Sequence, residues 1–128
     1  MTDDLFGNIE ETPSKLHIDE RRTGDVTVLA LSGEMLVDDG DVALRQRIHE
    51  LIEQGRVKLL IDLAAVTHLD SACVGMIVAK QKSVRDHGGD LKLVHLTSRS
   101  QRLLALMKIV SVFEAFDDEE TAVRSFGS

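Results

Sequence analysis

Three residue types of a hydrolase triad lie close together at His68, Asp70 and Ser71. In such enzymes a histidine takes the proton of a serine hydroxyl and a carboxylate orients the imidazole. The G-x-S-x-G pattern that exposes a nucleophilic serine is absent around Ser71, so the sequence does not favour catalysis. Two other interpretations stay open. Asp70 or Ser71 is the ordinary N-cap of a helix, or the Ser71 hydroxyl is a phosphorylation site.

Sites for nucleotides, metals and other cofactors are not predicted. Neither Gly-rich phosphate-binding pattern, G-x-x-x-x-G-K-[ST] or G-x-G-x-x-G, occurs in the chain. The segment Asp38-Asp39-Gly40-Asp41 lacks the spacing and the closing Glu of a calcium loop, which favours helix capping. No metal-ligand spacing relates the five histidines, which are His17, His49, His68, His87 and His95.

Length and composition indicate one folded domain, because the chain has 128 residues, 43% of them hydrophobic and 29% charged. Fifteen basic and 22 acidic residues leave a formal charge of −7, and the acids gather at the two ends. We predict a flexible acidic tail over residues 1–14 and a single domain over residues 15–128. The absence of Trp and Tyr and of a concentrated basic face argues against nucleic-acid binding.

A cytoplasmic location is expected from two observations. No apolar run is long enough to cross a bilayer, and the first residues are acidic where a signal peptide would be basic. The single cysteine, Cys73, permits no internal disulfide, in agreement with a reducing compartment. Membrane insertion is therefore not expected.

The first half of the chain predicts a hairpin, a helix and a buried strand. Leu16 to Ile18 and Val26 to Leu31 form the hairpin around a turn at 23–25, and Gly33 ends it. A helical stripe follows, capped by Asp39 or Asp41 and stopped by Gly55, with apolar positions Leu44, Ile48, Leu51 and Ile52. The aliphatic run 57–63 fits a strand buried on both faces and leads to Asp70-Ser71.

The second half alternates helices and strands. One helix begins at Asp70-Ser71 and stops at Gly88-Gly89, and Leu91 to Leu96 is the next strand. A capping box at 98–101 starts another helix, 112–113 is a possible short strand, and the acids at 117–120 open a last helix. This order predicts an α/β fold with a mixed, mostly parallel sheet of four to five strands, an opening hairpin and about four helices. Asp70-Ser71 lies where such sheets place sites, at the carboxyl end of a strand.

These residues resemble the STAS domain of bacterial anti-sigma factor antagonists over roughly residues 15–126. The likeness rests on the ordered set of a leading L-x-G at 31–33, a D-S-[SAT]-G-[LIV]-G type motif at Asp70-Ser71-Ala72-Cys73-Val74-Gly75, and the G-G-x-L-x-L strand entry at 88–93. Cys73 stands where the family usually has Gly, and Ala72 stands where many relatives have Ser or Thr.

The resemblance implies a STAS-like fold and a partner switch without enzymatic activity of its own. The unphosphorylated antagonist would bind an anti-sigma factor that is also a serine kinase. Phosphorylation would then release it, and a Ser/Thr phosphatase would reverse the modification. By position Ser71 is the phosphoacceptor and Asp70 the motif acid. The alternative is a constitutive STAS subunit of a lipid-transport ATPase or another scaffold that is not phosphorylated.

We expect the partner to dock on the start of the helix, at Asp70, Ala72, Cys73 and Met76. Met76 is an adaptable apolar contact there or packs under a neighbouring element. The dipole of the helix can lower the pKa of a thiol in its first turn, which would make Cys73 redox-active, but a small apolar filler is the favoured interpretation. A phosphate on Ser71 would lie at the positive end of the helix, so the fold should tolerate it.

Overall fold

A computed structural model describes residues 15–36 and 39–127. Its five strands form one sheet in the order β1-β2-β3-β4-β5, in which β1 pairs antiparallel with β2 and all other pairs are parallel. In chain order the elements are β1 (Leu16–Thr23), β2 (Val26–Met35), α2 (Asp39–Glu53), β3 (Lys58–Leu69), α3 (Ser71–Asp86), β4 (Asp90–Val94), α4 (Ser98–Leu106), β5 (Ala115–Phe116) and α5 (Glu119–Arg124). The predicted mixed, mostly parallel α/β fold is confirmed.

The opening hairpin is confirmed, and its β1–β2 pairing ends at Gly33 as predicted, although strand β2 itself continues. The turn lies at Gly24 and Asp25, as predicted, and Gly24 takes a φ of +63° that a glycine adopts readily. Strand β2 continues through Gly33 to Met35, with a shift of register against β3 after Gly33. A Cβ atom on Gly33 would lie 2.1 Å from the Lys15 carbonyl oxygen, so this glycine permits a close approach of two strands.

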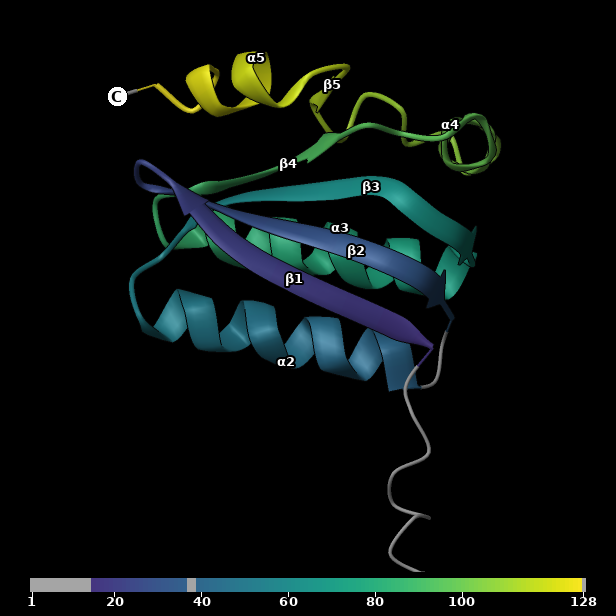
Figure 1. Cartoon of the computed structure of the whole chain (residues 1–128), viewed down its shortest axis with the longest axis horizontal. Helices are drawn as coiled ribbons and strands as arrows, with labels where there is room; N and C mark the ends of the chain where they lie inside the picture. The colour runs from purple at the N-terminus through teal and green to yellow at the C-terminus, as the bar shows by residue number, and fades with distance from the viewer. Residues whose placement is uncertain (1–14, 37–38, 128) are drawn as a thin grey trace, which may run out of the picture.

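Helices α2 and α3 lie side by side on one face of the sheet (Figure 1). The larger hydrophobic core fills the space between them and the strands. The stripe predicted for α2 is correct, since Leu44, Ile48 and Leu51 are fully buried and Ile52 packs at the edge. Asp41 lies inside the first turn of α2, where its carboxylate accepts a hydrogen bond from Arg45 at 2.8 Å. Asp39 is the first residue of α2, so both predicted caps, Asp39 and Asp41, lie within the helix, and residue 38 lies outside the described residues.

The opposite face carries α5 and a smaller core made by Val26, Val28, Leu60, Val94 and Ala122 (Figure 1). The acids at 117–120 open this helix as predicted, with Asp118 as N-cap.

Lys92 is buried beneath α5. Its Nζ donates to the carbonyl and the hydroxyl of Ser125 at 3.0 Å each and pairs with Glu114 at 2.7 Å. The rings of Phe116 and Phe126 lie 5.9 and 4.7 Å from the same ammonium group. Lys92 therefore joins Ser125 and Phe126, which follow α5, to strand β4 of the sheet.

Two local predictions in the last third of the chain are wrong. The short strand lies at Ala115–Phe116 and not at 112–113, because the segment after α4 first makes turns that bury Phe113. Helix α4 begins at Ser98 as expected, but its N-cap is Thr97, whose hydroxyl accepts from the Ser100 N–H at 3.0 Å. The cap thus lies one residue before the predicted Ser98, and the predicted capping box at 98–101 is not the cap of α4.

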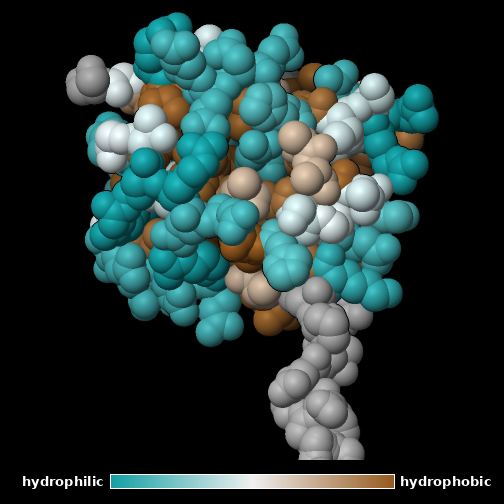
Figure 2. Space-filling model, in the orientation of Figure 1, coloured by the Kyte–Doolittle hydropathy of each residue, from teal (hydrophilic) through white to brown (hydrophobic). Residues whose placement is uncertain are grey.

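Hydrophilic residues cover most of the surface drawn in Figure 2, and apolar side chains reach it in separate small patches. In the described part of the chain, no helix combines the length and the apolar character needed to span a membrane.

Candidate functional site

Asp70 and Ser71 lie at the carboxyl end of β3, where the chain turns into α3. Asp70 has an extended backbone and its Oδ1 accepts a hydrogen bond from the Cys73 N–H at 2.9 Å. Of the two residues predicted as the N-cap, Asp70 takes this role. Ser71 is the first residue of the helix. The cap satisfies one of the free N–H groups of the first turn.

The Ser71 side chain is exposed. Among residues 15–36 and 39–127, no partner accepts or donates a hydrogen bond to its hydroxyl. The hydroxyl stands at the positive end of a 16-residue helix that has no acidic residue in its first turn. The helix dipole favours an added anion at this position, and the carboxylate of the N-cap Asp70 opposes it.

The surface beside Ser71 is built from small residues. Ala72 and Gly75 are exposed, and a Cβ atom added to Gly75 would meet nothing within 4 Å. Met76 is half-buried and packs against the larger core, and the rest of its surface remains exposed beside Ala72 and Gly75. The start of α3 thus offers a shallow surface that another protein can approach closely.

Cys73 does not belong to this surface. Its side chain is fully buried in the larger core, so the expectation that it contacts a partner directly is corrected. Burial raises the pKa of the Cys73 thiol to about 12, and the carboxylates of Asp70 and Asp41 act in the same direction. The structure therefore agrees with a small apolar filler and not with a redox-active thiolate.

Alkylation of Cys73 by iodoacetamide at pH 8 is expected to be at least about a thousandfold slower than alkylation of free cysteine. The raised pKa lowers the thiolate fraction by about this factor, and burial of the side chain slows the reaction further. Mass spectrometry of quenched samples measures this rate, and the rate in 6 M guanidinium chloride serves as the control.

The free energy of unfolding should also fall as the pH rises above 9.0, since the thiol of the unfolded chain ionises there and the thiol of the folded chain only near 12. Rapid modification of the folded chain would contradict this assignment.

Asp70→Ala is expected to lower the free energy of unfolding by about 1 kcal/mol, because the Cys73 N–H loses its acceptor. Asp70→Asn is the matched control, since an amide oxygen also caps a helix. That variant should keep most of the stability while it lowers the pKa of Cys73, which the Asp70 carboxylate raises. Urea unfolding followed by circular dichroism measures both variants. Equal losses of stability for both would contradict a capping role.

Contacts between distant segments hold this edge of the sheet together. The Asp70 N–H donates to the Met35 carbonyl at 3.4 Å, which joins the ends of β2 and β3. Arg99, at the start of α4, donates from Nη1 to the Thr67 carbonyl at 2.9 Å. The sequence did not identify Met35 or Arg99 as residues of the site. Each lies far from Asp70 along the chain, and only the folding of the chain brings it to this edge of the sheet.

His68 is not arranged as a catalytic base for Ser71. Its Nδ1 lies 3.0 Å from the Thr67 hydroxyl and 3.6 Å from Glu34, and no contact with Ser71 occurs. Within the described residues, no three His, Cys, Asp or Glu side chains come together in a way that could hold a metal ion.

Comparison with known proteins gives consistent results. A family model described as "Mlab, STAS domain" matches residues 18–112. The anti-sigma-B factor antagonist of Bacillus subtilis (strain 168) is 32% identical over 102 residues, which cover 80% of this chain and 89% of that protein.

Two solved structures resemble the fold. An anti-sigma factor antagonist from Mycobacterium paratuberculosis matches with a TM-score of 0.75 and 22% identity, over 88% of this chain and 95% of the other. The Bacillus cell fate determinant SpoIIAA in its phosphorylated form matches with a TM-score of 0.67 and 18% identity, over 85% and 98%. At these identities the likeness concerns the fold alone.

Proposed function

The chain belongs to the STAS-domain family of anti-sigma factor antagonists, and from this membership we propose that it is a phosphorylation-controlled partner switch. In its unmodified form it binds an anti-sigma factor that is also a serine kinase. Phosphorylation of Ser71 releases it, and a Ser/Thr phosphatase restores the binding form. The observation that carries the proposal is the Ser71 hydroxyl, which is exposed at the start of α3 and has no hydrogen-bond partner among the described residues.

The helix terminus lets the modification act at the surface without unfolding the domain. A phosphate adds about −1.5 to −2 charges at neutral pH. At the start of α3 its interaction with the helix dipole is favourable by about 0.3–1 kcal/mol. Together with the neighbouring Asp70 carboxylate it makes this end of the helix strongly anionic. A partner that packs closely on Ala72 and Gly75 would then meet both a larger group and an unpaired charge.

The replacement of the usual family glycine by Cys73 is compatible with this switch. The thiol points into the core and adds no bulk to the surface that a kinase must approach. Ala72 leaves Ser71 as the hydroxyl available in the motif. The proposed docking surface accordingly consists of Asp70, Ser71, Ala72, Gly75 and the exposed part of Met76.

Intact-mass analysis of the protein from its native cell tests the proposal. A fraction of the chain should be heavier by about 80 Da, the mass of a phosphoryl group, and phosphatase treatment should remove this mass. Peptide fragmentation should map the group to Ser71. A chain that stays unmodified under all growth conditions, or that carries the group elsewhere, would instead favour the constitutive subunit of a lipid-transport ATPase or another scaffold.

A further inference from the structure

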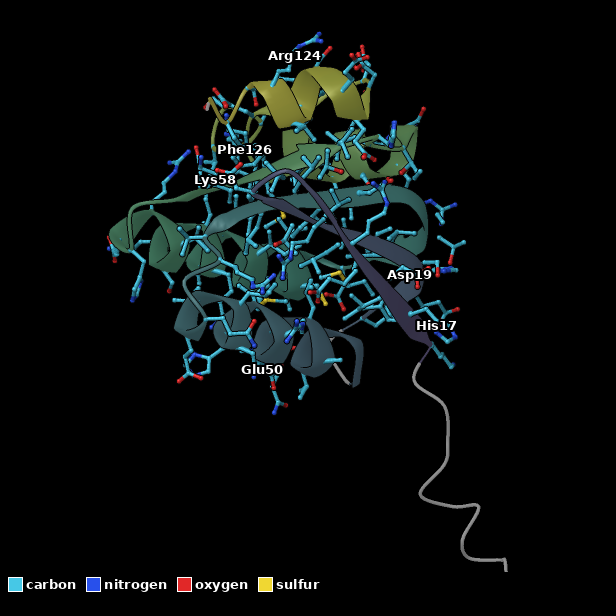
Figure 3. The ribbon with its side chains drawn as sticks, turned by 60° about the vertical axis from the view of Figure 1, so that its left-hand side comes forward. His17, Asp19, Glu50, Lys58, Arg124 and Phe126 are labelled. Atoms are coloured by element: carbon cyan, nitrogen blue, oxygen red, sulfur yellow. The ribbon has the colours of Figure 1, made fainter. Side chains whose placement is uncertain are left out.

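A hollow of about 220 Å³ lies at the end of the sheet away from Ser71, between the hairpin turn and the connection from α2 to β3. Lys58 begins β3 and borders the hollow, whereas Ser71 follows the end of the same strand. Twelve residues of strand separate the two places by roughly 36 Å. In Figure 3, Lys58 lies far from His17, the second residue of β1, which lies at the Ser71 end of the sheet. The hollow is therefore independent of the proposed switch.

The charge around this hollow is positive. Lys58 donates from Nζ to Asp25 at 2.7 Å, so these two lining charges largely compensate each other. Arg22 and Arg56 also line the hollow, and within the described residues neither guanidinium makes a side-chain hydrogen bond or an ion pair. Arg56 interacts electrostatically with the Glu20 carboxylate. This carboxylate already accepts two hydrogen bonds from Arg47, at 2.6 and 2.9 Å.

A buried threonine, Thr27, also lines the same hollow. Thr27 is 1% exposed, and no described residue forms a hydrogen bond with its side chain. A buried hydroxyl left unsatisfied is unfavourable, so such groups normally have a partner. Thr27 stands directly opposite Arg22 in the β1–β2 pairing, which places the hydroxyl and one free guanidinium on the same part of the sheet.

We propose that this hollow binds a small molecule through a phosphate group. Arginine guanidinium groups match phosphate oxygens in geometry and charge, and the Thr27 hydroxyl supplies a neutral donor. The volume is below the roughly 300–1,000 Å³ of sites for drug-sized ligands, which indicates a ligand of the size of inorganic phosphate or a short phosphomonoester.

Titration of the full-length chain with sodium phosphate, followed by amide NMR spectra at constant ionic strength, tests this inference. Amide signals of residues 22–27 and 54–58 should shift saturably, and sodium chloride or acetate in place of phosphate should not reproduce the shifts. Glycerol phosphate is titrated in parallel. Tighter binding of the ester assigns the site to a phosphomonoester, and tighter binding of phosphate assigns it to the free ion.

Arg22→Gln and Arg56→Gln should each weaken phosphate binding about tenfold, because each removes a charge-assisted donor. Thr27→Val should weaken it about threefold. Arg102→Gln, at an exposed arginine on α4, is the matched control and should leave the binding unchanged. Ser71→Ala should also bind phosphate normally, which separates this site from the proposed switch. Shifts that do not saturate, or that persist in both arginine variants with melting temperatures equal to wild type, would overturn the inference.

Discussion

Ser71→Asp is expected to weaken binding of the anti-sigma factor about a hundredfold, which corresponds to about 2.7 kcal/mol. The physical reason is that, in the proposed complex, the substitution places an unpaired carboxylate inside the interface at the start of α3. Ser71→Ala removes the phosphoacceptor and adds no charge, so its affinity should stay within about threefold of wild type. Isothermal titration calorimetry with the purified anti-sigma factor, in the absence of ATP, measures both variants.

Ser111→Asp provides the charge control for this experiment, since Ser111 is an exposed serine in the segment after α4. It should bind like wild type. All variants should share the melting temperature of wild type, and the amide spectrum of Ser71→Asp should differ only near residues 68–76. Equal affinities of Ser71→Ala and Ser71→Asp would refute the switch and support a constitutive subunit.

Gly89→Ala is expected to lower the free energy of unfolding by about 4 kcal/mol, a large effect for one methyl group. A Cβ atom at this position would lie 1.9 Å from the Val57 carbonyl oxygen and 2.5 Å from the Val57 Cβ. The Asp90 N–H donates to the same carbonyl at 2.9 Å, so the entry of β4 cannot move away without losing a hydrogen bond. Guanidinium unfolding monitored by circular dichroism measures the loss.

Gly75→Ala is the matched control, because it adds the same methyl group where nothing lies within 4 Å. Gly75 sits inside α3, where alanine is favoured over glycine, so this variant should gain about 0.5–1 kcal/mol. Similar losses for the two variants would show that steric contact at Gly89 is not what limits the stability.

Hydrophobic periodicity predicted most of the elements and the sheet. The stripe of Leu44, Ile48 and Leu51 and the aliphatic run that begins β3 depend only on the period of a helix and on burial of a strand, both of which are local properties. The junction at Asp70-Ser71 followed from the same alternation, because strand ends and helix starts coincide in parallel sheets.

The features missed in the sequence depend on contacts between segments. Gly33 reads locally as a strand terminator, but its role is to let the Lys15 carbonyl approach. Strand β5 lies three residues after the predicted position because the chain first makes turns that bury Phe113. The strand propensity of single residues does not predict such turns. Cys73 lies one turn from exposed residues, and only its position relative to the sheet decides that the thiol points inward. Even the cap of α4 depends on the choice between Thr97 and Ser98, which share the same chemistry.

The contacts of Lys92 make the end of the chain a structural part of the domain. Truncation before Ser125 would take two oxygen partners from a buried ammonium and leave it with Glu114 and the Phe116 ring. The ammonium group of Lys92 would then need water molecules in place of the two oxygens of Ser125. Shortened versions of this protein should therefore melt at lower temperature even though no residue of the sheet has been changed.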